Sequence, residues 1–381
     1  MILNAAMERY LEDSREDLLK LIRDLCAIPA PSNHEELRAA FCKEWFEQNG
    51  GTNVEIDEAL NVICPCGVTA DNDIVVFMAH TDTVFPEMEP LPFREEDGKY
   101  YSPGVCDDTA NLAVLMIVAR WFLQGGYQPK CGILFVANSG EEGLGNLKGS
   151  RAICDRYGDR MKELITLDGV SFAEFVNHAV GSHRYRVTVR TEGGHSFSKF
   201  GNRNAIRCMA SLIDSLYSVK VPEENGSKTT YNVGIISGGT SVNTIAQECE
   251  MLYEYRSDHK NCLAAMEKMF YAMVEAYRAT GIEVEAERIG ERPCSGDLDP
   301  VRYQALMDRA AESLRDVIGV EPKYRSGSTD CNIPLSRGIP AVCISVVTGA
   351  GCHTRTEWLE LASLQKGCRF FMDLLAKYYE L

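Results

Sequence analysis

The sequence of 381 residues lacks an apolar run of the about 18 residues that a membrane-spanning helix needs. Basic residues are also few, with 39 lysines and arginines against 55 aspartates and glutamates, which gives a net charge of −16. Such a chain repels nucleic acid and anionic lipid, so we expect neither nucleic acid nor a membrane as a partner. The N-terminal segment has neither the basic start nor the apolar core of a secretory signal.

The sequence also lacks a disulfide framework. Its 15 cysteines are odd in number and scattered, and most stand in apolar or mixed runs, as Cys26, Cys208 and Cys343 do. We therefore predict reduced thiols and a cytoplasmic protein. A thiol enzyme is an alternative, but Cys352 is the one cysteine beside a histidine of the motifs described below, and a metal site explains that histidine better.

The sequence does contain apolar runs that predict buried strands alternating with helices. Continuous apolar runs at 74–79, 132–138 and 164–167 predict buried strands, and the run at 110–123 predicts a buried helix. The alternation predicts an α/β fold, with helices on both faces of a mixed sheet. The further elements of this style are expected at 7–28, 35–48, 300–317 and 359–379 (helices) and at 341–347 (a strand).

The middle of the chain has a different character. Residues 183–191 alternate polar and apolar side chains, as an antiparallel strand with one solvated face does. The elements that follow give a β-α-β-β-α-β order, with helices over 204–219 and 260–279 and strands at 231–236, 248–256 and 282–289. This order predicts an inserted α+β two-layer sandwich. We therefore predict a catalytic domain formed by residues 1–180 and 292–381, and an inserted domain formed by residues 181–291.

Polar side chains follow the ends of the predicted buried strands, which is where sites form in open α/β sheets. His80 and Asp82 come after one strand, Glu141 and Glu142 after the next, and Asp168 after a third. Adjacent acids such as Glu141 and Glu142 repel each other unless a cation or a proton lies nearby.

Two further segments add candidate ligands. Asp107 and Asp108 stand where a glycine-rich loop enters a helix, although simple helix capping would also explain an aspartate there. His353 lies in a glycine-rich loop after the strand at 341–347, where a lone histidine is usually only solvated. Two imidazoles and three carboxylates suit a pair of zinc ions, and the candidate ligands are His80, Asp107, Glu142, Asp168 and His353.

The motifs HTDTV, GVCDD, SGEEGLG, LDG, GGHS and STD, with the late histidine, resemble in order and spacing the dinuclear zinc aminoacylase and carboxypeptidase family. This family includes peptidase T, glutamate carboxypeptidase, succinyl-diaminopimelate desuccinylase and acetylornithine deacetylase. The resemblance covers nearly the whole chain. It implies a zinc-peptidase-like α/β domain and an inserted lid that forms a homodimer.

The resemblance also implies roles for the ligands. His80 and Asp168 would bind the first metal, Glu142 and His353 the second, and Asp107 would bridge the two. Asp82 would orient His80, and Glu141 would be the general base. No role follows for Asp108.

For substrate contacts, the resemblance implies that His195 of GGHS reaches the active site of the partner chain. Asn243, Arg256, Ser328 and Thr329 would touch the carbonyl or carboxylate of the substrate. Many members have Lys-Gly or Lys-Ala after the paired aspartates, whereas this chain has Thr109 and Ala110, so no subfamily is assigned.

The resulting prediction is a hydrolase that cleaves an amide bond of a short peptide, of the tripeptidase, aminopeptidase or carboxypeptidase kind. Two divalent metal ions, zinc or else manganese or cobalt, would activate a water molecule. A deacylase of N-acyl amino acids is the first alternative. A catalytically inactive binding protein is a remote one, because the ligand set and Glu141 are intact.

Overall fold

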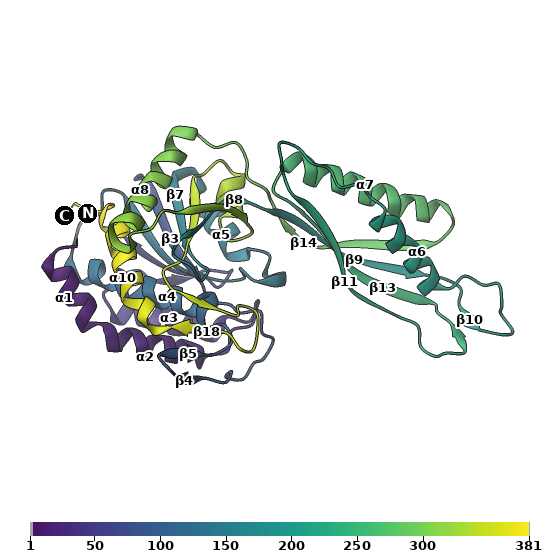
Figure 1. The fold of residues 1–381 in the computed structure, drawn as a ribbon, viewed down its shortest axis with the longest axis horizontal. Coiled ribbons are helices and arrows are strands. Elements are labelled where there is room, and N and C mark those ends of the chain that lie inside the picture. Colours follow the sequence, from purple (N-terminus) through teal and green to yellow (C-terminus); the bar gives the residue numbers. More distant parts are fainter. Residues whose placement is uncertain (1–2, 381) are drawn as a thin grey trace. The chain divides into compact units, whose positions relative to one another are not determined.

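The computed structural model describes residues 3–380, so that residues 1, 2 and 381 of the predicted catalytic segments lie outside it (Figure 1). The chain forms two compact units. Unit 1 consists of Met1–His178 and Gly296–Leu381, and unit 2 of Ala179–Ser295. The α/β fold with an inserted α+β sandwich that the sequence predicts is confirmed.

Unit 1 is built on a mixed sheet of eight strands. Its four central strands run parallel, because β3 pairs in parallel with β6 and β7, and β7 with β16. The flanking strands β2 and β8 pair antiparallel with this group. The order across the sheet is β1 (Glu55–Ile56), β2 (Val62–Cys66), β6 (Gly132–Asn138), β3 (Ile74–His80), β7 (Met161–Leu167), β16 (Ala341–Ile344), β8 (Glu174–Ala179) and β15 (Lys323–Gly327).

Helices pack on this sheet, with α4 against β3, α3 against β2 and α8 against β16. The helices of unit 1 are α1 (Ala5–Asp13), α2 (Arg15–Cys26), α3 (Glu36–Gln48), α4 (Asn111–Gly125), α5 (Lys148–Tyr157), α8 (Pro300–Ile318), α9 (Asn332–Ser336) and α10 (Leu361–Ala376). Every residue of β3 and β6 is buried, and α4 is buried on nearly all sides. These apolar segments form the core of unit 1 because they remove the largest continuous hydrophobic area from water.

A small antiparallel sheet and three short helical turns complete unit 1. The order in the small sheet is β17 (Gly349–Ala350), β18 (Trp358–Glu360), β5 (Lys99–Tyr101) and β4 (Arg94–Glu96). The turns are η1 (Val105–Ala110), η2 (Gly143–Gly145) and η3 (Gly158–Arg160).

Unit 2 is a sheet of four antiparallel strands with two helices packed on it. The sheet order is β11 (Thr229–Gly238), β13 (Glu248–Ser257), β9 (Gly181–Arg190) and β14 (Glu283–Arg292), and the helices are α6 (Ala205–Tyr217) and α7 (Lys260–Ala279). A separate two-stranded ladder joins β10 (Gly194–His195) to β12 (Thr244–Ile245). The core of unit 2 includes a ring contact between Tyr185 and Phe270, whose centroids lie 4.3 Å apart.

The single helix predicted over 7–28 is wrong, since α1 and α2 meet at Ser14. Arg120 donates a hydrogen bond of 3.0 Å to the Ser14 hydroxyl at this break. Within residues 3–380, no helix combines the length and the apolarity that crossing a bilayer would require.

Candidate active site

The parallel strands of unit 1 bring the predicted site residues to one edge of the sheet. His80, the last residue of β3, lies opposite Asn138, the last residue of β6. Leu167 of β7 lies opposite Ile344 of β16, so these two strands also end together. The segments that leave these carboxyl ends therefore converge, as is usual for sites in open α/β sheets.

The first cluster at this edge consists of His80, Asp107 and Asp168, each of which offers a ligand atom within 4.8 Å of the others. Nε2 of His80 lies 3.0 Å from Oδ1 of Asp107. His80 is buried, and its Nδ1 lies 3.0 Å from the backbone oxygen of Asp82. That contact turns Nε2 toward the carboxylates.

The second cluster consists of Asp107, Glu142 and His353, again within 4.8 Å of one another. Nε2 of His353 lies 2.8 Å from Oε1 of Glu142 and 3.1 Å from Oδ2 of Asp107. Asp107 therefore belongs to both clusters, and it turns one carboxylate oxygen toward each histidine.

Asp82 is a fully buried carboxylate that ties the neighbouring strand ends together. Its Oδ1 accepts a hydrogen bond of 3.0 Å from the backbone N–H of Glu141, and its Oδ2 accepts one of 3.0 Å from that of Glu142. Ser32 donates a third, of 2.6 Å. Burial acts to raise the pKa of Asp82, but the hydrogen bonds and the charge of His80 outweigh it and hold the pKa at about 2.

Glu141 and Glu142 lie in the tight turn after β6, and both are buried. Glu141, Glu142 and His80 form a further group of ligand atoms within 4.8 Å, so Glu141 also lies at the centre of the cluster. The glycines make this turn possible, because a Cβ on Gly145 would come within 2.5 Å of the backbone of Gly140.

The charges of the cluster fit cations. Burial and the charge of Asp107 raise the pKa of Asp168 to about 7. Hydrogen bonds to Asp107 and Glu142 raise the pKa of His353 to about 10. Without a metal, protons therefore offset the repulsion between the buried carboxylates. Imidazoles and carboxylates are the donors that divalent transition metals accept, so these residues fit a metal centre.

Two acidic residues hold the loop that carries Asp107, and the sequence assigned neither a role. Glu357 accepts hydrogen bonds from the backbone N–H groups of Gly104 (2.9 Å), Cys106 (2.7 Å) and Asp107 (3.0 Å). Asp108 accepts one of 2.9 Å from the backbone N–H of His80, so it is more than a helix cap. The spacing of Glu357 four residues after His353 is the only sequence signal, and it is weak.

The predicted lid residues lie in unit 2. His195 is exposed on β10, opposite Thr244 of β12. The neighbouring Asn243 accepts a hydrogen bond of 2.9 Å from Ser196 through its backbone oxygen. The structure therefore brings His195 and Asn243 together. Their substrate contacts stay predictions.

Arg256 lies at the other end of the same unit. It stands near the end of β13, opposite Ser182 of β9. Ser182 lies three residues after Ala179, where the chain crosses from unit 1 into unit 2. Both its Nε and its Nη2 donate to Glu254, at 2.9 and 3.0 Å. Its guanidinium is thus already paired within the chain.

Ser328 and Thr329 follow β15 in unit 1. Thr329 is buried, and its backbone N–H donates to the side chain of Asn332 at 2.9 Å. Thr329 and Asp168 both line a cavity of about 50 Å³, which places this loop beside the first metal-ligand cluster.

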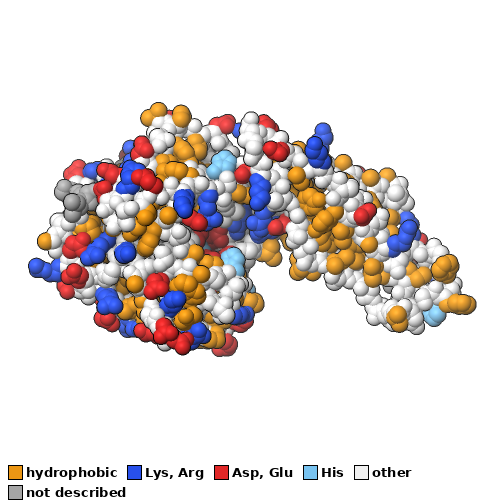
Figure 2. Space-filling view, viewed as in Figure 1, with side chains coloured by type: hydrophobic (Ala, Val, Ile, Leu, Met, Phe, Trp, Pro, Cys, Tyr) orange, Lys and Arg blue, Asp and Glu red, His pale blue; other side chains and the backbone are white. Residues whose placement is uncertain are grey.

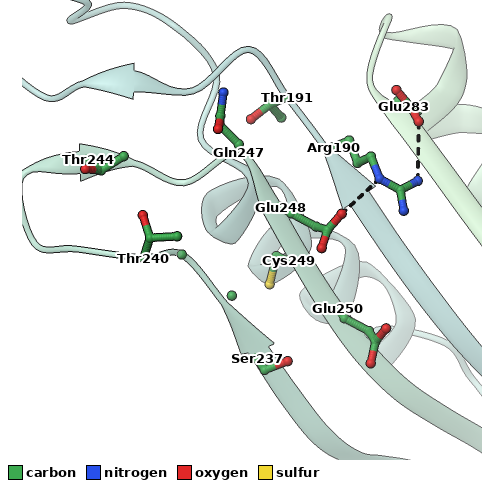
Figure 3. A pocket seen from close by; sticks show the side chains of 12 residues that line it. Arg190, Thr191, Ser237, Thr240, Thr244, Gln247, Glu248, Cys249, Glu250 and Glu283 are labelled. Atoms are coloured by element: carbon green, nitrogen blue, oxygen red, sulfur yellow. Dashed lines mark hydrogen bonds and ion pairs between the residues drawn. The ribbon is translucent and has the colours of Figure 1, made fainter.

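A much larger hollow of about 790 Å³ lies on unit 2 (Figure 3). Its walls contain none of the predicted metal ligands. Arg190 lines the hollow and forms ion pairs with Glu248 (2.9 Å) and Glu283 (3.4 Å). These charged side chains of the hollow are therefore paired with one another. We assign the chemistry to the smaller, buried cluster of unit 1, because it joins titratable groups that fit a metal and this hollow does not.

The model of peptidase family M20/M25/M40 matches residues 76–377, which include all five candidate ligands. The chain belongs to this family. It is therefore a hydrolase of a metal-dependent family, and the resemblance inferred from the motifs is confirmed.

Relatives in the family have different names. A succinyl-diaminopimelate desuccinylase from Alkalilimnicola ehrlichii is 23% identical over 322 residues, which cover 80% of this chain and 84% of that protein. A probable carboxypeptidase from Trichophyton verrucosum is 25% identical over 284 residues, or 65% of this chain. The chain matches only 59% of that carboxypeptidase's length.

Solved structures have the same fold. A tripeptidase from Staphylococcus aureus superposes with a TM-score of 0.76 at 23% identity, and the match covers 96% of this chain and 98% of that one. At this identity the likeness establishes the fold of an M20 enzyme, and the substrate has to be inferred separately.

Proposed function

We propose that this M20 enzyme cleaves an amide bond of a short peptide with the help of two divalent metal ions held in unit 1. The observation that carries the proposal is the position of Asp107, which turns Oδ1 toward His80 and Oδ2 toward His353. A carboxylate placed in this way can serve two ions at once. Zinc is the ion that best suits this donor set, with manganese and cobalt as alternatives.

The remaining ligands divide between the two positions. His80 and Asp168 would hold one ion, and Glu142 and His353 the other, while Asp82 keeps His80 in its ring orientation. When bound, the ions acidify a water molecule and polarise the scissile carbonyl.

Glu141 moves the proton in this proposal. Its backbone is fixed by Asp82, and its buried carboxylate lies within the cluster. It accepts the proton of the attacking water and passes it to the leaving nitrogen. Glu141 could act as a ligand instead, since its carboxylate lies within 4.8 Å of ligand atoms of His80 and Glu142. Because five other residues already complete the ligand set, we assign the proton transfer to Glu141.

Substrate binding would draw on both units. Ser328 and Thr329 would meet the substrate beside Asp168, and Arg256 would exchange its pairing with Glu254 for a substrate carboxylate. His195 and Asn243 would meet the carbonyl from the partner chain of a homodimer.

Two features of unit 2 support the homodimer. β11 is an edge strand, and it carries the exposed Ile235 and Ile236. Phe197 and Phe200, which follow His195, are 87% and 91% exposed. Hydrophobic side chains gather over unit 2 in Figure 2. An unpaired edge with apolar side chains is suited to pairing with a second copy.

The substrate class remains divided between two candidates. The motifs favour a peptide, and the probable carboxypeptidase supports that choice. The desuccinylase relative supports the alternative, an N-acyl amino acid. A cytoplasmic location is part of the proposal, because the 15 cysteines are all free thiols.

A substrate screen tests the proposal. The zinc-, manganese- or cobalt-loaded enzyme is incubated with dipeptides, tripeptides and N-acyl amino acids, and released amines are measured. We expect the highest kcat/KM on a peptide. A higher value on an N-acyl amino acid would favour the deacylase, and no turnover of any amide would favour the inactive binding protein.

A further inference from the structure

Three side chains of the kinds that bind metals meet in unit 2, and none of them belongs to the proposed active site. They are Glu224, in the turn before β11, His259, the residue before α7, and Cys262, in the first turn of α7. One ligand atom from each lies within 4.8 Å of the other two.

The separation between the histidine and the glutamate matches that of ligands in a tetrahedral zinc site. Bonds of about 2.0–2.3 Å place neighbouring ligand atoms roughly 3.3–3.6 Å apart. Nδ1 of His259 already lies 3.6 Å from Oε2 of Glu224. The sulfur of Cys262 lies within 4.8 Å of a ligand atom of each of these two residues.

The imidazole of His259 supplies an unused donor atom. Its Nδ1 is buried and has no hydrogen-bond partner among residues 3–380, although it lies opposite a carboxylate. A buried nitrogen without a hydrogen bond costs stability, which a bound cation would recover.

The surrounding residues orient the other two ligands. Nδ2 of Asn261 lies 3.2 and 3.1 Å from the two oxygens of Glu224 and so fixes that carboxylate. The hydroxyl of Ser227 lies 3.5 Å from the sulfur of Cys262 and also accepts a hydrogen bond of 3.0 Å from the backbone N–H of Glu224. Such supporting contacts are typical of metal sites.

The charge balance also fits. The amino end of a helix disfavours a bare cation but stabilises a thiolate, and Cys262 lies in the first turn of α7. A divalent ion bound by one thiolate and one carboxylate carries no net charge, so the helix dipole no longer opposes it.

We propose that Glu224, His259 and Cys262 bind a single zinc-like cation, distinct from the pair in unit 1. A sulfur ligand selects a borderline or soft ion such as zinc or cobalt over magnesium or calcium. The bound ion would fasten the turn at 224–227 to the start of α7.

Cobalt titration of the whole metal-free protein tests this proposal. A cobalt–thiolate bond gives a near-ultraviolet charge-transfer absorption, and no cysteine is among the proposed ligands of unit 1. The absorption therefore reports a thiolate-bound ion rather than the pair proposed for unit 1, and it would develop even if the proposed function were wrong. We expect it in the wild type, with one more ion bound per chain than in Cys262→Ser.

Variants separate this site from the other thiols. Cys262→Ser should abolish the absorption, whereas the control Cys208→Ser, at a buried thiol in the first turn of α6, should keep it. His259→Asn should weaken cobalt binding by about tenfold or more, since even residues that merely orient a ligand cost about that much, and it provides the test if Cys262→Ser does not fold. Absence of the absorption in the wild type, or its persistence in Cys262→Ser, would overturn the proposal.

Discussion

At the scale of single residues, Asp82 connects the cluster of candidate metal ligands to the backbone around it. One oxygen faces Glu141 and the other Glu142, while His80 and Ser32 lie on the same carboxylate. An ionised carboxylate can accept from all these donors at once, whereas an amide presents one oxygen and one N–H₂ group. The charge of Asp82 is therefore needed for the geometry of its neighbours.

Asp82→Asn should weaken metal binding by about 10–100-fold, the loss typical of a residue that orients a metal ligand. The amide N–H₂ group would face a backbone N–H, so that two hydrogen-bond donors would meet without an acceptor. The turn at 141–142 would therefore shift. Chelator competition measures the metal affinity. Ser32→Ala is the matched control, because it removes one donor and leaves the carboxylate. Equal metal affinity in the two variants would refute the orienting role.

The sequence identified the residues that the structure brings together in unit 1, because polar side chains at the ends of buried apolar strands form a recognisable pattern. It gave no role to Glu357, which holds the Asp107 loop through backbone N–H groups. Contacts to backbone depend on how the chain is folded in space and leave no residue pattern. For the same reason, the contact between Asp108 and the His80 backbone could not be predicted.

At the scale of elements, Glu357 links two parts of the chain that both carry candidate ligands. It precedes β18, and its carboxylate receives three backbone N–H groups from the segment that leads into η1. The loop of His353 and the loop of Asp107 are thereby held in one arrangement.

Glu357→Gln should lower the free energy of unfolding by about 1–3 kcal/mol, because at least one buried N–H loses its acceptor. Urea unfolding of the metal-free protein measures this loss without a contribution from bound ions. Glu360→Gln, three residues further along at the end of β18, is the control and should change little. A loss no larger than that of the control would contradict the anchoring role.

His183 should make the stability of unit 2 sensitive to acid. Burial, and then the charge of Arg288, lower its pKa to about 4, while Glu291 acts in the opposite sense. Nδ1 of His183 lies 2.8 Å from the Tyr255 hydroxyl, and Glu267 is 4.0 Å away. The folded state therefore binds fewer protons than the unfolded state between about pH 6.5 and pH 4, so stability falls as the pH is lowered through this window.

Thermal unfolding between pH 7.5 and pH 4 tests the acid sensitivity. His183→Asn should remove up to about 3 kcal/mol of the decrease, since one pKa unit corresponds to about 1.4 kcal/mol. His178→Asn changes an exposed histidine and should leave the decrease intact. If His183→Asn and the wild type lose stability in parallel, another group is responsible.

The long elements were predictable and the short ones were not. β6 and α7 have the bounds expected from the sequence, because each is one continuous run of a single pattern. β1, β10 and β17 are two-residue strands, whose pairing depends on distant partners. The apolar run at 341–347 predicts a longer strand than β16, which ends at Ile344. Ser345 then turns away to donate a hydrogen bond of 2.8 Å to the backbone of Gly169.

At the scale of the whole molecule, the proposed reaction requires residues from both units. Unit 2 begins at Ala179, and β9 then runs from Gly181 to Arg190, a length of about 30 Å at about 3.3 Å per residue. His195 follows β9, so the chain carries it to the end of unit 2 remote from the crossings, whereas Arg256 lies at the near end. This separation supports donation of His195 to a partner's site.

Mixed dimers should recover activity from two inactive parents. His195→Ala lacks the proposed carbonyl contact, whose loss typically costs about 10²–10³-fold in turnover, and Glu141→Gln lacks the base. After subunit exchange, one site of a mixed dimer would combine an intact Glu141 with the partner's intact His195. Labelled subunits verify the exchange. Exchange without recovered activity would exclude the contribution across the dimer.

The central claim, that Glu141 transfers the proton in a metal-dependent amide hydrolysis, is tested most directly by Glu141→Gln. Turnover on the best substrate of the screen and metal content per chain are measured on the same preparation. We predict that the variant keeps two ions in unit 1. Its kcat should fall by about 10²–10⁴-fold, because general base catalysis typically contributes that much. Substantial turnover in the metal-loaded variant would contradict the claim.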